Sequence, residues 1–175
     1  MCPGICKDRL ADAFKRFGRV PIEKRKVRLP PGHPALDVRE APFWSAGGLI
    51  HDGHGHVLLV RHSREKGWGD AWVTPGGLLE QGETVLDGLR REVREEVGLE
   101  VAEPRLTRIL QQTLTDGVRT RPGYFAQIVA RAESATARPG PDVVEARWFD
   151  HLPENLAFRD DYVTDFARFV RGATF

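Results

Sequence analysis

The chain has 175 residues, enough for one domain with a sizeable core but too few for two full domains. Its formal net charge of +1 excludes a general attraction to nucleic acid or anionic membranes, and no apolar run reaches the roughly 18 residues that a membrane helix needs. The first residues also lack the long apolar segment of a secretory signal. We therefore expect a cytoplasmic protein with no membrane partner.

Residues 1–40 are predicted to form a helix and an extended segment that pack on the core. Apolar residues recur at helical spacing from Cys6 to Phe17, and Gly18 follows as a helix stop. Cys2 and Cys6 are the only cysteines. A bond between them would close a trivial loop, and two cysteines without a second pair make no structural zinc site, so we interpret them as free thiols.

A basic cluster follows, and it allows either a nucleic-acid contact or a solvated strand face. Its members are Lys24, Arg25, Lys26 and Arg28. The chain shows no clustered exposed aromatics for stacking bases and no recognisable RNA motif. The solvated strand face is therefore the preferred interpretation, and we do not expect nucleic acid as a partner.

Residues 41–175 are predicted to form the main domain, which begins with a hairpin. The apolar runs "FWSAGGLI" and "VLLVRH" are joined by "HDGHGH", whose Asp-Gly pair indicates a turn. His51, His54 and His56 of this turn allow a metal site, but histidines at a hairpin tip are usually solvated, and no Cys or acidic partner completes a recognisable ligand set.

Further elements follow in chain order. A helix is predicted from about Thr84 to Val97, with Gly98 as its stop. A second hairpin turns at residues 115–117, "ESATARPGPD" reads as a loop, and "EARWFD" resembles a last short strand. A C-terminal helix is predicted from the spacing of Tyr162, Phe166, Phe169 and Val170.

The central helix carries three carboxylates on one face, at Glu92, Glu95 and Glu96. Like charges at this spacing destabilise a helix by roughly 0.2–0.5 kcal/mol per pair. From residue 77 to residue 100 there are seven acidic and three basic residues. A solvated helix laced with ion pairs is one interpretation. A divalent cation such as Mg²⁺, which prefers oxygen ligands, is the other, because it neutralises the cluster.

Residues 77–99 resemble the Nudix box. The match consists of Gly77, Glu83, Arg91-Glu92-Val93, Glu95-Glu96 and Gly98-Leu99 at the spacing of that motif. The resemblance implies a Nudix domain over residues 41–175, of the α/β (α+β) class, with a mixed β-sheet sandwiched between α-helices. It also implies Mg²⁺- or Mn²⁺-dependent hydrolysis of a phosphoanhydride bond in a nucleoside diphosphate linked to another moiety. A regulatory domain that binds a nucleotide without turnover is the alternative.

The resemblance also assigns roles to matching residues. The metal ligands are Glu92, Glu95 and Glu96, with the carbonyl of Gly76 as a possible further one. Glu83 and Arg91 support the helix and orient the carboxylates. The general base is Glu95 or Glu96, or an acid on a loop outside the box, where Asp142 and Glu145 are the candidates.

Substrate contacts are sought among aromatic and basic residues. Aromatics that can stack on a base are Trp44, Trp68, Trp72 and Tyr124, although aromatics in strands are more often core. Trp72 and Tyr124 are our substrate-binding candidates. Arg61, His62, Arg64 and Lys66 allow either phosphate contacts or solvated loop charges, and we select Arg61 and Arg64 as substrate-binding candidates. A homodimer is predicted because Phe14, Phe17 and the aromatic C-terminal helix offer more apolar surface than one small core needs.

Overall fold

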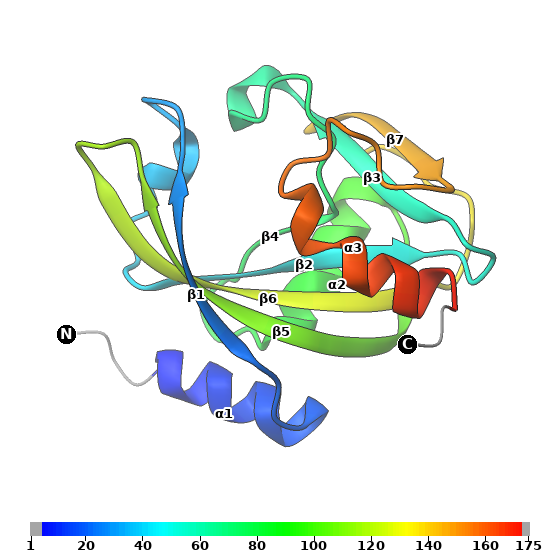
Figure 1. Ribbon diagram of the computed structural model, residues 1–175, viewed down its shortest axis with the longest axis horizontal. Helices are drawn as coiled ribbons and strands as arrows, with labels where there is room; N and C mark the ends of the chain where they lie inside the picture. Colours follow the sequence, from blue (N-terminus) through cyan, green and yellow to red (C-terminus); the bar gives the residue numbers. More distant parts are fainter. Residues whose placement is uncertain (1–4, 173–175) are drawn as a thin grey trace.

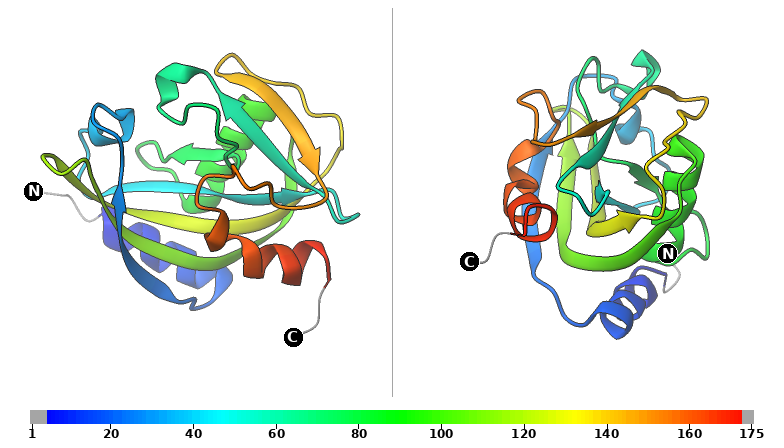
Figure 2. Two further views of the ribbon diagram at one scale, coloured as in Figure 1. Left: turned by 45° about the horizontal axis from the view of Figure 1, so that its top comes forward. Right: turned by 90° about the vertical axis from the view of Figure 1, so that its right-hand side faces the viewer.

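Seven strands form one mixed β-sheet, and helices cover both of its faces (Figures 1 and 2). This computed structural model describes residues 5–172, so Cys2 lies outside the described residues. The sheet contains both parallel and antiparallel pairs. The predicted mixed sheet sandwiched between helices is confirmed.

The strand order is β1-β5-β6-β2-β3-β7, and β4 pairs with β2 beside this path. The strands are β1 (Ile22–Arg28), β2 (Phe43–His51), β3 (Val57–His62), β4 (Gly76–Leu78), β5 (Val101–Thr115), β6 (Thr120–Ala132) and β7 (Val143–Phe149). The two predicted hairpins are β2–β3 and β5–β6, and the predicted last strand is β7.

The sheet opens along one edge of β2, and this opening places the glutamate-bearing segment. One edge of β2 pairs with β6 along its whole length. The other edge is shared, because β4 pairs with residues 45–47 and β3 pairs with residues 50 and 51. A side chain at Gly76 would place its Cβ 2.3 Å from the carbonyl oxygen of Ala46. Glycine therefore lets β4 lie against β2 at the split.

Helix α2 (Val85–Val97) runs behind the sheet in Figure 1 and carries the glutamates. The Thr84 side chain caps its first turn by accepting a hydrogen bond from the backbone N–H of Asp87 (3.2 Å). Gly98 ends the helix in the left-handed conformation, with φ of 67°. The predicted helix is confirmed, with Thr84 as its cap. Its apolar stripe is fully buried at Val85, Leu89, Val93 and Val97.

Helix α1 (Ile5–Phe17) packs on the same face of the sheet as α2. Ala13 is fully buried, and Leu10, Phe14 and Phe17 pack against the core cluster that contains the apolar stripe of α2. Gly18 follows with φ of +82°, as expected of a helix stop. None of the helices within residues 5–172 is long and apolar enough to cross a membrane.

The C-terminal segment covers the opposite face of the sheet (Figure 2). It consists of α3 (Val163–Asp165) continued by a π-helical turn, η4 (Phe166–Val170). Phe166, Phe169 and Val170 pack against a second core cluster with Trp72 and Phe149. The aromatic residues of both terminal helices that suggested a homodimer are thus packed within the chain.

Strand β1 is an edge strand that runs parallel to β5. Lys24, Lys26 and Arg28 are exposed, in agreement with a solvated strand face. Arg25 is half-buried because it turns inward, where its Nη2 donates to Oε1 of Gln112 (3.2 Å). The division of the chain into residues 1–40 and 41–175 stays a prediction.

Residues 133–142 form a loop without regular structure that is fixed to the C-terminal end of α2. The backbone N–H of Arg138 donates to the carbonyl of Val97, and that of Gly140 to the carbonyl of Glu96 (both 2.8 Å). At its end, the carbonyl of Asp142 accepts from the N–H of Ser63 (3.1 Å). The bonds to Val97 and Glu96 satisfy carbonyls of the last turn of α2 that would otherwise lack partners.

Gly140→Ala is expected to loosen this loop. A Cβ there would lie 1.9 Å from the carbonyl oxygen of Glu95, and backbone atoms cannot move aside cheaply. We expect a loss of about 1–3 kcal/mol in the free energy of unfolding, as for other overpacked sites. Urea denaturation measures this loss. The control is Thr136→Ala in the same loop, and an equal effect in both variants would contradict the explanation.

Candidate active site

Glu92, Glu95 and Glu96 line one hollow of about 260 Å³ with residues of β3 and of the 133–142 loop. The other lining residues are His62, Lys66, Pro141, Asp142 and Val143. Glu96 is buried, Glu92 is half-buried, and the side chain of Glu95 is 58% exposed. The structure therefore brings the three predicted metal ligands together with Asp142.

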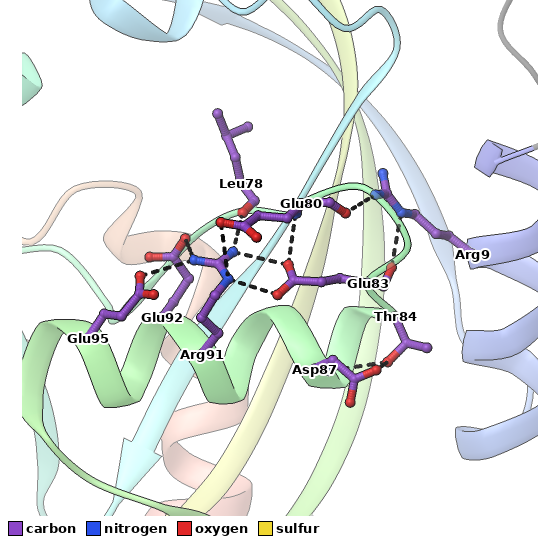
Figure 3. Close-up of polar contacts among 9 residues, drawn as sticks. All are labelled: Arg9, Leu78, Glu80, Glu83, Thr84, Asp87, Arg91, Glu92 and Glu95. Atoms are coloured by element: carbon purple, nitrogen blue, oxygen red, sulfur yellow. Dashed lines mark hydrogen bonds and ion pairs between the residues drawn. The ribbon is translucent and has the colours of Figure 1, made fainter.

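Arg91 is the hub that orders this face of α2 (Figure 3). Its Nε and Nη2 donate to the two carboxylate oxygens of Glu83, at 2.7 and 3.0 Å. Its Nη1 donates to Glu92 (2.9 Å) and to Glu95 (3.1 Å). Nη2 also donates to the carbonyl of Leu78 (2.8 Å), which ties the helix to β4. Glu83 and Arg91 thus form one hydrogen-bonded network with Glu92 and Glu95, and their supporting role stays a prediction.

Glu96 is fixed by two contacts on its two oxygens. Its Oε2 accepts from the backbone N–H of Gly76 (3.0 Å), and its Oε1 lies 3.1 Å from Nε2 of His62. Burial lowers the pKa of His62, but the hydrogen bond and the negative charge of Glu96 outweigh burial, so the pKa of His62 is raised overall. The ring is thereby held toward its charged form beside the glutamates.

The surroundings of Glu92 disfavour the charged form of its carboxylate. Burial is the largest cause that raises the pKa of Glu92, and the charges of Glu96 and Glu95 raise it further against the opposing bond from Arg91. A cation placed among these carboxylates would favour their charged forms.

The donor set fits a hard divalent cation, because carboxylate oxygens are the ligands that Mg²⁺ and Mn²⁺ prefer. A Cβ at Gly77 would lie 2.5 Å from Oε1 of Glu92, so only glycine allows this carboxylate to rest on the backbone of β4. Within residues 5–172, no three His, Cys, Asp or Glu side chains are already arranged around one point. Glu92 and Glu95 each use one oxygen for Arg91, so the second oxygen of each can face a cation while Arg91 holds the carboxylate.

A second hollow, of about 220 Å³, lies beside the glutamates and is largely aromatic and apolar. Trp68, Phe158 and Tyr162 line it, as do Gly76 and Gly77 of β4. His62 lines both hollows, so the two adjoin at this residue. A flat aromatic group and an attached anion would find separate, adjoining surfaces here.

The two aromatic residues selected for substrate binding do not line this cavity. Trp72 is 7% exposed and packs edge-to-face on Phe149, with ring centroids 4.8 Å apart. Tyr124 stacks on Trp44 at 4.8 Å, and Trp44 is core. Trp68 lines the cavity instead, held edge-on between His33 and Phe158. Position in the loop before the box, rather than in a strand, is the signal that favours Trp68.

The two arginines selected for phosphate binding do not line the hollow of the glutamates. Arg61 lies beside Glu145, with which it forms an ion pair, and over the Trp72 ring at 5.0 Å. Arg61 and Glu145 are paired in register on β3 and β7, away from the hollow that the glutamates line. Arg64 lies exposed in a short 3₁₀ turn, η2 (Arg64–Lys66), and lines neither hollow.

Lys66 and Asp142 line the hollow of the glutamates, whereas Arg64 and Glu145 do not. Nζ of Lys66 lies 2.8 Å from Oδ2 of Asp142. The hydrogen bond with Lys66 is the largest cause that lowers the pKa of Asp142. Of the two loop acids predicted as bases, the structure therefore brings only Asp142 to the glutamates.

A family model described as the NUDIX domain matches residues 42–165, well over half of the chain. The chain belongs to the NUDIX domain family. The identification from the box is confirmed, and the hydrolase class is that of its named relatives.

Curated NUDIX relatives differ in how much of their length the chain covers. An ADP-ribose pyrophosphatase of Methanocaldococcus jannaschii is 29% identical over 170 residues, which cover 90% of this chain and 89% of that protein. The 8-oxo-dGDP phosphatase NUDT18 of Danio rerio is 27% identical over 66% of this chain, but the match spans only 34% of that protein. The Nudix hydrolase YvcI of Bacillus subtilis is 43% identical over 35% of this chain and 36% of that protein. The chain thus spans about a third of the length of the last two.

Solved NUDIX structures share the fold. A NUDIX hydrolase from Nitrosomonas europaea superposes with a TM-score of 0.60 at 21% identity, covering 77% of this chain and 76% of that one. An ADP-ribose pyrophosphatase from Streptococcus suis gives a TM-score of 0.55 at 22% identity, covering 75% of this chain and 92% of that one. At these identities the likeness establishes the fold alone.

Residues outside the NUDIX box complete the candidate site and were not selected from the sequence. Arg25 of β1 lines the aromatic cavity, lies 4.9 Å from the ring centroid of Phe158 and pairs with Asp161. Gln112 of β5 lines the same cavity. Arg25 belongs to the basic cluster. Because side chains alternate between the two faces of a strand, this alternation is the signal from which an inward-facing Arg25 could have been predicted.

Proposed function

We propose that this NUDIX chain hydrolyses a phosphoanhydride bond in a nucleoside diphosphate linked to another moiety, with Mg²⁺ or Mn²⁺ as cofactor. The observation that carries the proposal is the meeting of the carboxylate hollow and the aromatic cavity at His62. A nucleobase held beside Trp68 would direct the attached diphosphate toward Glu92 and Glu96. Recognition of the base and cleavage of the anhydride would thus use adjoining surfaces.

In this proposal Glu92, Glu95 and Glu96, with the Gly76 carbonyl, would hold the cation. When bound, a divalent cation neutralises diphosphate oxygens, lowers the pKa of water and stabilises the leaving phosphate. Arg91 and Glu83 keep the three carboxylates on one face. The hydrogen bond from the Gly76 N–H fixes the orientation of Glu96.

Asp142 and Glu95 are the two carboxylates of the hollow that we consider as the base for the attacking water. Asp142 is bonded by Lys66, which lowers its pKa and so its tendency to take a proton. Glu95 accepts from Arg91 through Oε2 and is largely exposed. We therefore assign the proton to the other oxygen of Glu95, which would contact the cation only through that water. Glu145 is left out, because its carboxylate is paired with Arg61 away from the hollow.

ADP-ribose is the first substrate to test, since the relative that the chain covers almost fully is named an ADP-ribose pyrophosphatase. A panel should add other diphosphate sugars, dinucleoside polyphosphates and nucleoside triphosphates, each with Mg²⁺ and with Mn²⁺. Released nucleoside monophosphate or phosphate is the readout. Binding of a nucleotide without any product across the panel would replace hydrolysis by the regulatory alternative.

Trp68→Ala is expected to raise the KM for the best substrate roughly tenfold, the loss typical of one base–aromatic stack, with kcat nearly unchanged. The reason is that Trp68 lines the cavity away from the carboxylates. Steady-state kinetics measure both constants. Arg64→Ala is the matched control, because Arg64 lines neither hollow, and its KM should equal that of the parent. A parent-like KM in Trp68→Ala would contradict the placement of the nucleobase in this cavity.

A homodimer and a cytoplasmic location also stay predictions. Phe14 and Phe17 pack on the core of their own chain, so a dimer would have to use other residues. Light scattering that reports about 20 kDa at micromolar concentration, near the chain mass of 19.6 kDa, would remove the dimer.

A further inference from the structure

Helix α1 reaches the NUDIX box through one buried arginine. Arg9 is 4% exposed. Its Nη2 donates to the carbonyl of Glu80 (2.6 Å) and its Nε to the carbonyl of Glu83 (3.2 Å). Both carbonyls belong to the loop that leads from β4 into α2 (Figure 3). The family match begins at residue 42, so this contact comes from a helix outside the matched residues.

The loop between residues 79 and 84 is exposed at its tip and has few backbone hydrogen bonds of its own. Glu80, Gln81 and Gly82 are exposed, and the one backbone bond within the loop runs from the N–H of Glu83 to the carbonyl of Glu80 (3.2 Å). Arg9 binds the same carbonyl together with that of Glu83, so the fork of its guanidinium sets the distance between the two ends of the turn.

The turn passes its geometry to the carboxylates through side chains already described. The N–H of Glu80 donates to Oε2 of Glu83 (2.7 Å), and both oxygens of Glu83 hold Arg91. Arg91 in turn holds Glu92 and Glu95. A chain of contacts therefore runs from α1 to two proposed metal ligands without a gap.

A purely structural explanation accounts less well for an arginine here. A buried cation is costly unless it is paired, and the nearest carboxylate, of Glu40, lies 3.8 Å from Nη1, which has no hydrogen bond among the described residues. An apolar side chain on this buried face of α1 would pack beside Ala13 without that cost. With an apolar residue in place of Arg9, the carbonyls of Glu80 and Glu83 would lose the hydrogen bonds that the guanidinium donates.

We propose that Arg9 is a positioning residue: by clamping the 80–83 turn from α1, it holds Glu83 and Arg91 so that Glu92 and Glu95 are oriented for the divalent cation. This inference rests on the proposed function. It makes α1 part of the active-site machinery.

The test compares Arg9→Met, which keeps the apolar stem, and Arg9→Lys, which keeps the charge but lacks the fork. Binding of Mn²⁺ is followed by the loss of the electron paramagnetic resonance signal of the free ion, and kcat and KM are measured with ADP-ribose or the best substrate of the panel. We expect Arg9→Met to weaken Mn²⁺ binding and to lower kcat roughly tenfold, the low end for residues that orient metal ligands, with KM near that of the parent. Arg9→Lys should recover part of both losses. If Arg9→Met does not fold, Arg9→Lys carries the test.

Two controls separate positioning from stability. Arg16→Met changes an exposed arginine of the same helix and should match the parent. Phe14→Leu weakens the packing of α1 and should lower the melting temperature while leaving Mn²⁺ affinity and kcat unchanged. Two results would overturn this inference without touching the proposed function. One is parent-like Mn²⁺ affinity and kcat in Arg9→Met. The other is a Phe14→Leu variant that melts at the same temperature as Arg9→Met and shows the same losses of Mn²⁺ affinity and kcat. A parent that neither binds Mn²⁺ nor turns over any substrate overturns the proposed function and this inference with it.

Discussion

Glu96→Gln is expected to lower hydrolysis by roughly 10³-fold or more while leaving the metal-free protein as stable as the parent, or slightly more stable, at a pH where His62 is neutral and forms no ion pair with Glu96. A loss of this size is typical when charge stabilisation is removed from phosphoryl transfer. The glutamine carbonyl can still accept from the N–H of Gly76, so the fold keeps that bond. One of the charges that raise the pKa of Glu92 disappears, which relieves repulsion in the empty cluster.

Thermal melts with and without Mg²⁺ or Mn²⁺, paired with turnover, measure both effects. The cation should raise the melting temperature of the parent by mass action, since the assembled site exists only in the folded state. Glu96→Gln and Glu95→Gln should lose much of that rise. Glu154→Gln, an exposed glutamate, is the control and should keep it. Full activity in both cluster variants, with an unchanged metal-induced shift, would restore the solvated charged helix.

Local signals made much of the fold predictable. Thr84 and Gly98 bound α2 because a cap and a left-handed stop act within one turn of the helix end. The Asp52 side chain organises the first hairpin by accepting from the backbone N–H groups of His54 (2.7 Å) and His56 (3.1 Å). Such contacts span few residues, and the chain order alone brings their partners together.

The faces of the strands were harder to assign. The sequence does not say which face of β3 meets α2, and an irregularity in its pairing with β7 lies between Arg61 and His62. His62 therefore meets Glu96, whereas Arg61 meets Glu145 and Trp72. The same uncertainty made Trp72 and Tyr124 candidates for substrate binding, although Trp72 is buried and Tyr124 packs, partly buried, against the core.

Contacts between distant segments lay beyond prediction from one sequence. Arg9 meets carbonyls 71 and 74 residues further along the chain, and carbonyls leave no trace in residue type. Arg25 reaches the aromatic cavity because β1 joins the sheet edge beside β5. The NUDIX box was visible because its partners lie within 23 residues on one helix and the adjoining loop.

Arg91→Met should destabilise the protein as well as inactivate it, in contrast to Glu96→Gln. Removal of the guanidinium leaves Glu83 and Glu92, each less than a fifth exposed, without the cation that is hydrogen-bonded to them. Breaking a buried pair in this way costs about 3 kcal/mol of unfolding free energy, whereas the exposed pair with Glu95 adds little. Turnover should fall roughly 10–100-fold, because Glu92 and Glu95 lose their orienting bonds. Arg91→Lys should recover little of either, since an ammonium cannot reach Glu83, Glu92 and the Leu78 carbonyl together.

The pH dependence of this loss identifies its cause. The hydrogen bond with Arg91 is the largest cause that lowers the pKa of Glu83, so its stabilisation is fully present above the ordinary glutamate value of 4.5 and is lost as the pH falls through the lowered pKa. Urea denaturation of parent and Arg91→Met in EDTA should therefore show a gap in unfolding free energy that is constant near neutral pH and narrows in acid. Arg90→Met, one residue away on α2, is the control and should show no such gap. A gap of the same size at every pH would mean that Arg91 stabilises the helix by packing of its stem, and the ion-pair hub would then not be what orders the carboxylates.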